Sequence, residues 1–233
     1  MKTKYKHLFF DLDNTLWSFD KNSKETLREL FVGYHLNLYF SSFEEFYVSY
    51  KKKNEELWVL YGGGKIDKQF LNVERFEAIF REAGVPILSQ APTIADDYLQ
   101  LVKTKTHLMP FALPVLDYLR EKGYQMHIIS NGFSEVQYFK INNSGLKPYF
   151  ASIYLSETVK KHKPDKLFFD YAIKSSNARK TESLVIGDNW QADIFGARNA
   201  GIDQAFYNIS NEKEMPFAPT YEITSLEELK LIL

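Results

Sequence analysis

Five short apolar segments constrain the fold of this 233-residue chain more than any other feature. Each is only a few residues long and largely apolar throughout, instead of alternating between apolar and polar residues. Such segments are typical of parallel strands that are covered on both faces of a sheet. The segments are 5–10, 124–129, 152–155, 183–186 and 204–207.

Segments of helical length separate the later strands. We expect helices at 113–122, 133–143, 164–175 and 190–200. Gly123 and Gly201 follow two of them, where glycine favours a helix end, and Pro164 opens a third, where proline is tolerated in a first turn. The alternation of strand and helix from about residue 111 onward predicts an α/β fold with a parallel sheet.

Residues 17–107 have a different pattern, with no convincing strand. Amphipathic helices are expected at 24–39, 43–60, 67–82 and 94–106, with their aromatic residues mostly in the core. We therefore expect a Rossmann-like α/β core formed by 1–16 and 108–233, and an all-helical cap domain formed by 17–107. Because the insert lies between two groups of polar residues described below, we expect it to act as a lid that sets specificity.

Four polar clusters follow predicted strands. They are Asp11-Leu12-Asp13-Asn14-Thr15, Ser130-Asn131-Gly132, Lys163-Pro164, and Gly187-Asp188-Asn189 with Asp193. The carboxyl ends of parallel strands share one edge of a sheet, and ligands bind at that edge. The clusters are therefore expected to meet there, although Lys163 follows its strand at a distance.

The residue types in these clusters point to phosphoryl chemistry. Asp11, Asp13 and Asp188 would repel one another unless a divalent cation joined them, and all-oxygen ligands favour Mg²⁺. Ser130, Asn131 and Lys163 would supply donors for the oxygens of a phosphoryl group. Two aspartates two residues apart can divide the roles of nucleophile and general acid–base.

Asp11-Leu12-Asp13-Asn14-Thr15-Leu16 resembles the DxDxT signature of the haloacid dehalogenase superfamily of phosphotransferases. Ser130, Lys163 and Gly187-Asp188 with Asp193 match the other three motifs of that superfamily in order. The resemblance covers nearly the whole chain, and the motif separations fit a member with a helical cap inserted after the first motif.

The resemblance implies a Mg²⁺-dependent phosphatase and a role for each matched residue. Asp11 would attack phosphorus and form an aspartyl-phosphate, and Asp13 would protonate the leaving alcohol and then activate water. The Asp11 carboxylate, the Asp13 backbone carbonyl and the Asp188 carboxylate would hold Mg²⁺. The remaining roles are phosphate binding by Ser130, Asn131 and Thr15, charge balance by Lys163, and support of the inner residues by Asp193 and Asn189, with Asp193 as a partner of Lys163.

Residues 12–17, 130–133 and 187–193 are similar to the bacterial nucleoside 5′-monophosphate phosphatases, so a nucleotide is the expected substrate. The alternatives are a sugar-phosphate phosphatase or β-phosphoglucomutase-like mutase, a phosphoglycolate phosphatase, a 2-haloacid dehalogenase, and a regulator that binds a phosphorylated ligand without turnover. Asp13 argues against a dehalogenase of this superfamily, and the intact nucleophile argues against a pure binder.

The composition limits which classes of molecule the protein is expected to bind. With 29 basic and 30 acidic residues, the chain lacks the basic excess of a protein that binds nucleic-acid polymers by bulk electrostatics. The absence of cysteine excludes disulfides and thiolate metal sites. No signal peptide or membrane span is visible. We expect a cytoplasmic monomer or homodimer that binds a small phosphorylated metabolite and no membrane.

Simpler interpretations exist for single motifs. Asp-x-Asp and Ser-Asn-Gly can form turns, Asp193 can stabilise a helix end, and Lys163 lies in a lysine-rich loop. The sequence Tyr61-Gly62-Gly63-Gly64-Lys65 fails as a phosphate-binding P-loop, because Val59 and Ile66 occupy positions that require glycine and serine or threonine. It remains either a flexible turn or a loop that faces the substrate.

Overall fold

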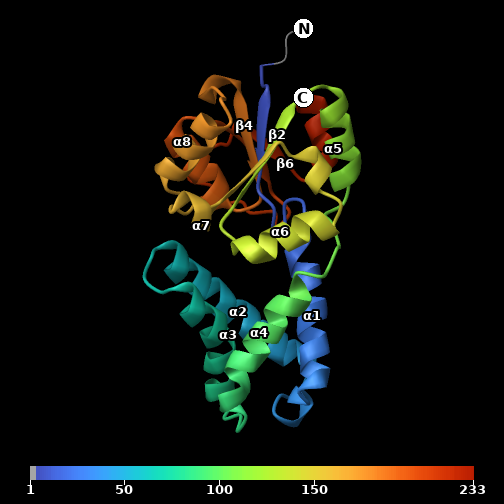
Figure 1. Cartoon of the computed structure of the whole chain (residues 1–233), viewed down its shortest axis with the longest axis vertical. Coiled ribbons are helices and arrows are strands. Elements are labelled where there is room, and N and C mark those ends of the chain that lie inside the picture. Colours follow the sequence, from blue (N-terminus) through green and yellow to red (C-terminus); the bar gives the residue numbers. More distant parts are fainter. Residues whose placement is uncertain (1–3) are drawn as a thin grey trace. The chain divides into compact units, whose positions relative to one another are not determined.

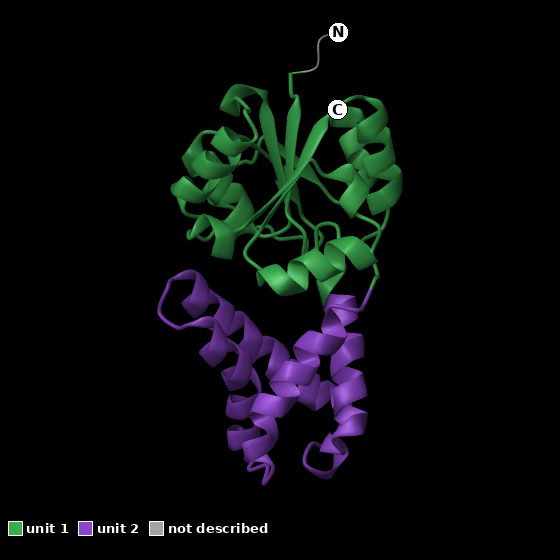
Figure 2. Ribbon diagram, viewed as in Figure 1, with its two compact units in different colours: residues 1–19, 106–233 green, residues 20–105 purple. Residues whose placement is uncertain are grey.

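The computed structural model describes residues 4–233, which form two compact units. Figure 2 shows the first unit, which comprises the described residues 4–19 and 106–233, and the second, residues 20–105. Residues 17–19 belong to the first unit and not to the helical insert. The Trp17 N–H donates to the carbonyl of Leu12 over 2.8 Å, and the Ser18 N–H donates to the carbonyl of His107 over 3.0 Å.

The first unit contains a six-stranded parallel sheet with the order β3-β2-β1-β4-β5-β6. The α/β fold is therefore confirmed. β6 was not predicted from the sequence, because its three residues include the exposed Glu222 and form no apolar run. The strands are β1 (His7–Phe10), β2 (Gln125–Ser130), β3 (Ser152–Leu155), β4 (Ser183–Gly187), β5 (Asp203–Tyr207) and β6 (Tyr221–Ile223).

β1 lies at the centre of the sheet, and all four of its residues are buried. Phe9 pairs with His127 on β2 and with Val185 on β4, and its side chain joins a core cluster with residues of α8 (Lys166–Ser175) and α9 (Gly196–Ala200). Phe10 points to the opposite face and contacts Phe150. Figure 1 shows α8 on one side of the sheet and α5 (Ala112–Glu121) on the other.

The remaining helices of this unit differ in detail from the prediction. Asp165 caps α8 by accepting from the Leu167 N–H over 2.9 Å, so Pro164 precedes the helix instead of lying in its first turn. The segment expected as one helix at 190–200 is a π-helical turn, η5, followed by α9. The other helices are α6 (Ser134–Asn143), η3 (Lys147–Tyr149), α7 (Ser156–Val159), η4 (Lys180–Glu182), η5 (Trp190–Phe195), η6 (Leu226–Glu228) and α10 (Leu229–Ile232).

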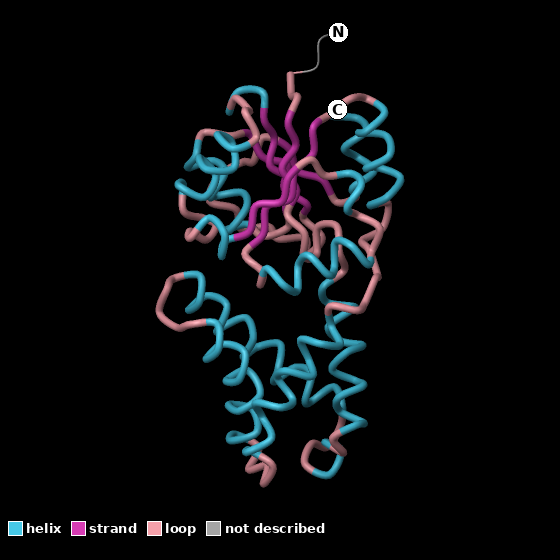
Figure 3. The backbone as a smooth tube through the Cα atoms, viewed as in Figure 1, coloured by secondary structure: helices cyan, strands magenta, loops and turns pink. Residues whose placement is uncertain are grey.

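The second unit consists of helices and loops, without a strand among residues 20–105 (Figure 3). Ser42 and Asp67 begin two of the helices by accepting backbone N–H groups with their side chains. Buried aromatic residues link the helices: the Tyr50 ring contacts that of Phe76, and the Phe76 ring contacts that of Tyr98. The helices are α1 (Phe19–Gly33, which begins in the first unit), η1 (Leu36–Leu38), α2 (Phe43–Gly62), α3 (Lys68–Glu82), η2 (Leu88–Gln90) and α4 (Ala91–Val102).

Two of these helices are shifted from their predicted positions. The helix expected at 24–39 runs from Phe19 to Gly33, and the helix expected at 94–106 runs from Ala91 to Val102. Across residues 4–233, none of the helices has both the length and the apolar character required to cross a bilayer.

Two histidines lie side by side in the core of the first unit. The Nδ1 atom of His7 lies 3.2 Å from the Nε2 atom of His127, and the two rings stack. The other ring nitrogen of His127 has no hydrogen-bond partner among the described residues. Burial, together with the nearby His7, lowers the pKa of His127 to about 4. Burial also lowers the pKa of His7.

This pair predicts a loss of stability in mild acid. Below its ordinary pKa near 6.5, His127 takes up a proton in the unfolded chain but not in the native protein. The free energy of unfolding should therefore fall by roughly 1–3 kcal/mol as the pH drops from 6.5 to about 4. We expect His127→Phe to flatten this slope in urea unfolding at several pH values, whereas His35→Gln, at an exposed site, should leave it unchanged. Equal slopes in the wild type and His127→Phe would contradict the assignment.

Candidate active site

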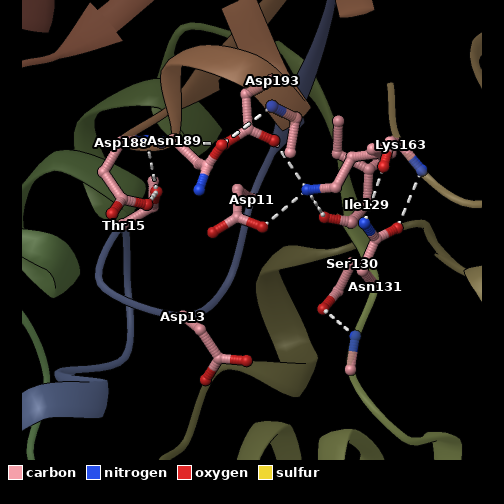
Figure 4. A network of polar contacts seen from close by, with 12 residues as sticks. Asp11, Asp13, Thr15, Ile129, Ser130, Asn131, Lys163, Asp188, Asn189 and Asp193 are labelled. Carbon is pink, nitrogen blue, oxygen red and sulfur yellow. Dashed lines mark hydrogen bonds and ion pairs between the residues drawn. The ribbon is translucent and has the colours of Figure 1, made fainter. Parts of the chain in front are cut away.

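The ends of three neighbouring strands bring the predicted residues to one edge of the sheet (Figure 4). The Asp11 N–H donates to the carbonyl of Ile186 over 2.9 Å and so extends the pairing of β1 with β4 by one residue. Ser130 ends β2, and Asp188 directly follows β4. The parallel register thus places Asp11 between Ser130 and Asp188.

Lys163 is the buried cation of this edge, with 3% of its surface exposed. Its Nζ atom donates to Asp11 Oδ1 over 2.7 Å, to Asp193 Oδ1 over 2.6 Å and to the carbonyl of Ile129 over 3.1 Å. Burial by itself would lower the pKa of Lys163, but the two carboxylates outweigh it and raise the pKa. The side chain is therefore a permanent cation held between two anions.

Asn131 fixes the backbone of Lys163. Its carboxamide donates to the Lys163 carbonyl over 2.9 Å and accepts from the Lys163 N–H over 2.8 Å. The sequence predicts Asn131 as a phosphate ligand through its backbone N–H, and the structure adds this side-chain clamp. The clamp explains how a lysine that follows its strand at a distance reaches the edge of the sheet.

Three carboxylates converge beside Lys163. Asp11, Asp188 and Asp193 each offer an oxygen within 4.8 Å of the others. Burial raises the pKa of Asp11 to about 7, which Lys163 opposes and Asp193 reinforces. Burial also raises the pKa of Asp188, with a further contribution from Asp11. One ammonium cannot balance three carboxylates, so this all-oxygen cluster fits a divalent cation.

Thr15 holds Asp188 in place. Its hydroxyl donates to Asp188 Oδ1 over 2.9 Å and accepts from the Asp188 N–H over 3.1 Å. The sequence predicts Thr15 among the phosphate ligands, whereas here its only proton is already donated to a carboxylate. In this geometry Thr15 orients a metal-ligand candidate, and a contact of Thr15 with phosphate stays a prediction.

Gly187 and Asn189 shape the position of Asp193, which is fully buried. A Cβ atom at Gly187 would lie 2.3 Å from Asp193 Oδ2, so only glycine permits this approach. The Asn189 N–H donates to Asp193 Oδ2 over 3.2 Å, while the Asn189 side chain caps η5 at the Ala192 N–H. Asp193 is thus held for its bond to Lys163, the partner that the sequence predicts for it.

Ser130 has a hydroxyl that can still donate a hydrogen bond. Its oxygen accepts from the Gly132 N–H over 3.1 Å and from Gln137 Nε2 over 2.9 Å. Both of these contacts use the oxygen, so the hydroxyl proton is left for an acceptor such as a phosphate oxygen. Together with the Lys163 ammonium, this donor makes the edge of the sheet suitable for an anionic group.

Asp13 lies apart from the carboxylate cluster (Figure 4). Lys140 and Gln137, both on α6, contact its two oxygens. The resemblance implies that Asp13 binds the metal through its backbone carbonyl, and these side-chain contacts are compatible with that role. Sequence reasoning missed Gln137 and Lys140. The sequence contains only a weak signal, which is that these two polar residues lie three positions apart and directly beside the apolar residues Val136 and Ile141.

Comparison with known proteins shows the family to which the sequence is related. The family model of the haloacid dehalogenase-like hydrolases matches residues 5–201. Pyrimidine 5′-nucleotidase YjjG of Escherichia coli is 31% identical, over 99% of this chain and 98% of its own length. Pyrimidine 5′-nucleotidase PynA of Streptococcus pneumoniae is 33% identical, over 97% of this chain and 93% of its own.

A solved structure is also similar over the whole length. The HAD-hydrolase YfnB from Bacillus subtilis, determined with bound magnesium, superposes with a TM-score of 0.88 at 30% sequence identity, and the match covers 99% of each chain.

The contact between Gly187 and Asp193 predicts that Gly187→Ala destabilises the protein. The added methyl group would push Asp193 from Lys163, and overpacking of this kind costs about 1–3 kcal/mol. Gly33→Ala is the matched control, because a Cβ atom there would meet nothing within 4 Å. Urea unfolding of both variants measures the difference, and a Gly187→Ala protein as stable as Gly33→Ala would contradict the assigned packing.

Proposed function

The chain belongs to the haloacid dehalogenase-like hydrolases, and we propose that it is a Mg²⁺-dependent phosphomonoesterase that acts on nucleoside 5′-monophosphates. The observation that carries the proposal is how the two carboxylate oxygens of Asp11 are arranged. Lys163 binds its Oδ1 atom and leaves Oδ2 for another partner, at the point where Asp11 and Asp188 converge. A carboxylate fixed by one oxygen beside a cation site is suited to attack phosphorus with the other.

In the first step, Asp11 Oδ2 attacks phosphorus and the bond from phosphorus to the ester oxygen breaks. Asp13 gives its proton to the leaving ribose oxygen, which departs as an alcohol. Ser130, the Asn131 N–H and Lys163 bind the phosphoryl oxygens during this transfer. The enzyme is left with an aspartyl-phosphate on Asp11 and a carboxylate on Asp13.

In the second step, the Asp13 carboxylate takes a proton from a water molecule that attacks the same phosphorus atom. The bond between phosphorus and Asp11 breaks, inorganic phosphate forms, and both aspartates return to their starting states. The Asp11 and Asp188 carboxylates and the Asp13 backbone carbonyl would hold Mg²⁺. When bound, the ion neutralises charge on the phosphoryl oxygens and acts as a Lewis acid.

Two features support a nucleotide as substrate. Two full-length relatives at 31% and 33% identity are pyrimidine 5′-nucleotidases. The second feature is coarser: Asp13 offers an acid for an alcohol leaving group, and the 5′-oxygen of a nucleoside is one such group.

Phosphate release measured over nucleotides, sugar phosphates and phosphoglycolate tests the proposal, and we expect nucleoside 5′-monophosphates to react fastest. Asp11→Asn should fold normally but lose at least ~10³-fold in kcat, because an amide is a poor nucleophile. Circular dichroism and thermal unfolding control for folding. A folded Asp11→Asn protein that releases phosphate at the wild-type rate would overturn the assignment of the nucleophile.

The all-oxygen ligand set predicts strict dependence on Mg²⁺, with Mn²⁺ or Co²⁺ as substitutes and Ca²⁺ as an inhibitor. Calcium accepts more ligands at longer distances, so it can engage both oxygens of Asp11 and leave none to attack. Activity should vanish in excess EDTA and return with Mg²⁺. Full activity in EDTA, or equal rates with Ca²⁺, would refute the proposed metal site.

A further inference from the structure

The carboxylate of Asp13 is held at both of its oxygens by one helix. Lys140 Nζ donates to Asp13 Oδ1 over 2.6 Å, and Gln137 Nε2 donates to Asp13 Oδ2 over 2.6 Å. The two donors are three residues apart on α6, so they project from the same face of that helix. Two contacts fix the plane of a carboxylate as well as its position.

Both donors are buried, with 3% of Lys140 and 1% of Gln137 exposed. The Lys140 ammonium also lies over the Trp17 ring, 4.1 Å from its centre. A buried lysine paired with a carboxylate is costly to maintain, because desolvation offsets much of the attraction between the charges. The position of Lys140 is therefore better explained by what it does for Asp13 than by a gain in stability.

Gln137 connects Asp13 to the phosphate-binding candidate Ser130. Its Nε2 atom bonds to Asp13 Oδ2 and, over 2.9 Å, to Ser130 Oγ. Its Oε1 atom has no partner in the described part of the chain. The reversed amide would place Oε1 against the carboxylate, so Asp13 fixes the orientation. A Cβ atom at Gly132 would lie 1.7 Å from Nε2, so glycine there makes room for the amide.

We propose that Gln137 and Lys140 are positioning residues for the reaction, which together fix the Asp13 carboxylate at two points and hold it in register with Ser130. This inference rests on the proposed function, since it concerns the acid–base step of that reaction. Lys140 orients the proton donor, and Gln137 sets the distance between the donor and the hydroxyl that binds the phosphoryl group.

The consequence is a selective defect. A general acid must lie within hydrogen-bond reach of the atom that it protonates, and small displacements are costly. Loss of either positioning residue should therefore harm esters whose leaving group needs a proton. It should do far less harm to p-nitrophenyl phosphate, because p-nitrophenolate leaves as a stable anion.

The experiment compares kcat/KM for uridine 5′-monophosphate and p-nitrophenyl phosphate, because kcat/KM reports on the first phosphoryl transfer. We expect Lys140→Met to lower the value for the nucleotide by ~10–100-fold and that for the aryl ester by only a few-fold. Lys140→Arg should recover part of the loss, since it keeps a donor and the charge. Lys147→Met, at an exposed lysine just beyond α6, should change neither substrate.

Three further variants separate positioning from a merely structural role. Asp13→Asn should show the same selectivity between esters, and Lys140→Met should add little to it in the double variant, because both changes act on one group. Gln137→Met gives a second test through the other oxygen of Asp13, and it serves if Lys140→Met fails to fold.

The outcomes distinguish the two proposals. A wild-type protein that hydrolyses neither ester with Mg²⁺ overturns the proposed function and this inference with it. An active wild type whose Lys140→Met and Gln137→Met variants lose equal factors on both esters overturns the inference alone. So does a double variant in which the losses from Lys140→Met and Asp13→Asn multiply.

Discussion

The buried ammonium of Lys163 is the contact on which the arrangement of the site depends. It joins three segments that are distant in sequence: the end of β1 through Asp11, the end of β2 through the Ile129 carbonyl, and η5 through Asp193. Removal of a charge from such a group leaves its partner buried and unpaired, which costs several kcal/mol. The parallel order of β2, β1 and β4 is what allows one side chain to reach all three.

The two aspartates of the first motif have separate neutralising partners, although they are two residues apart. Asp11 faces Lys163 and the carboxylates of Asp188 and Asp193, whereas Asp13 faces Lys140 and Gln137. Different surroundings for neighbouring carboxyl groups are the usual means of dividing nucleophilic and acid–base roles. The cluster around Asp11 has more carboxylates than cations, which suits a metal ion, whereas Asp13 in its carboxylate form has one counter-charge, Lys140.

The sequence predicts the parts of this arrangement that depend on local pattern. The strands that lead to Asp11, Ser130 and Asp188 are apolar runs. The edge of the sheet at which these residues meet could therefore be predicted from the sequence alone. Contacts that depend on the direction of a side chain could not be predicted from the sequence. Thr15 turns to Asp188, and Asn131 clamps the Lys163 backbone, because the packing of separate loops decides these partners. Gln137 and Lys140 were not predicted from the sequence, because a polar residue on a helix is ordinarily exposed to solvent. Only the structure shows that this face of α6 is buried.

Every residue to which a part of the reaction is assigned lies in the first unit, between Asp11 and Asp193. The second unit, residues 20–105, contributes none of the reacting groups. In the proposed reaction, all the assigned groups therefore come from one unit, and their roles can be examined through substrates of different leaving-group ability. An aryl ester depends on the nucleophile, Lys163 and the cation site, since its leaving group needs no proton. An alkyl ester depends in addition on the orientation of Asp13, so the difference between the two esters measures what α6 contributes.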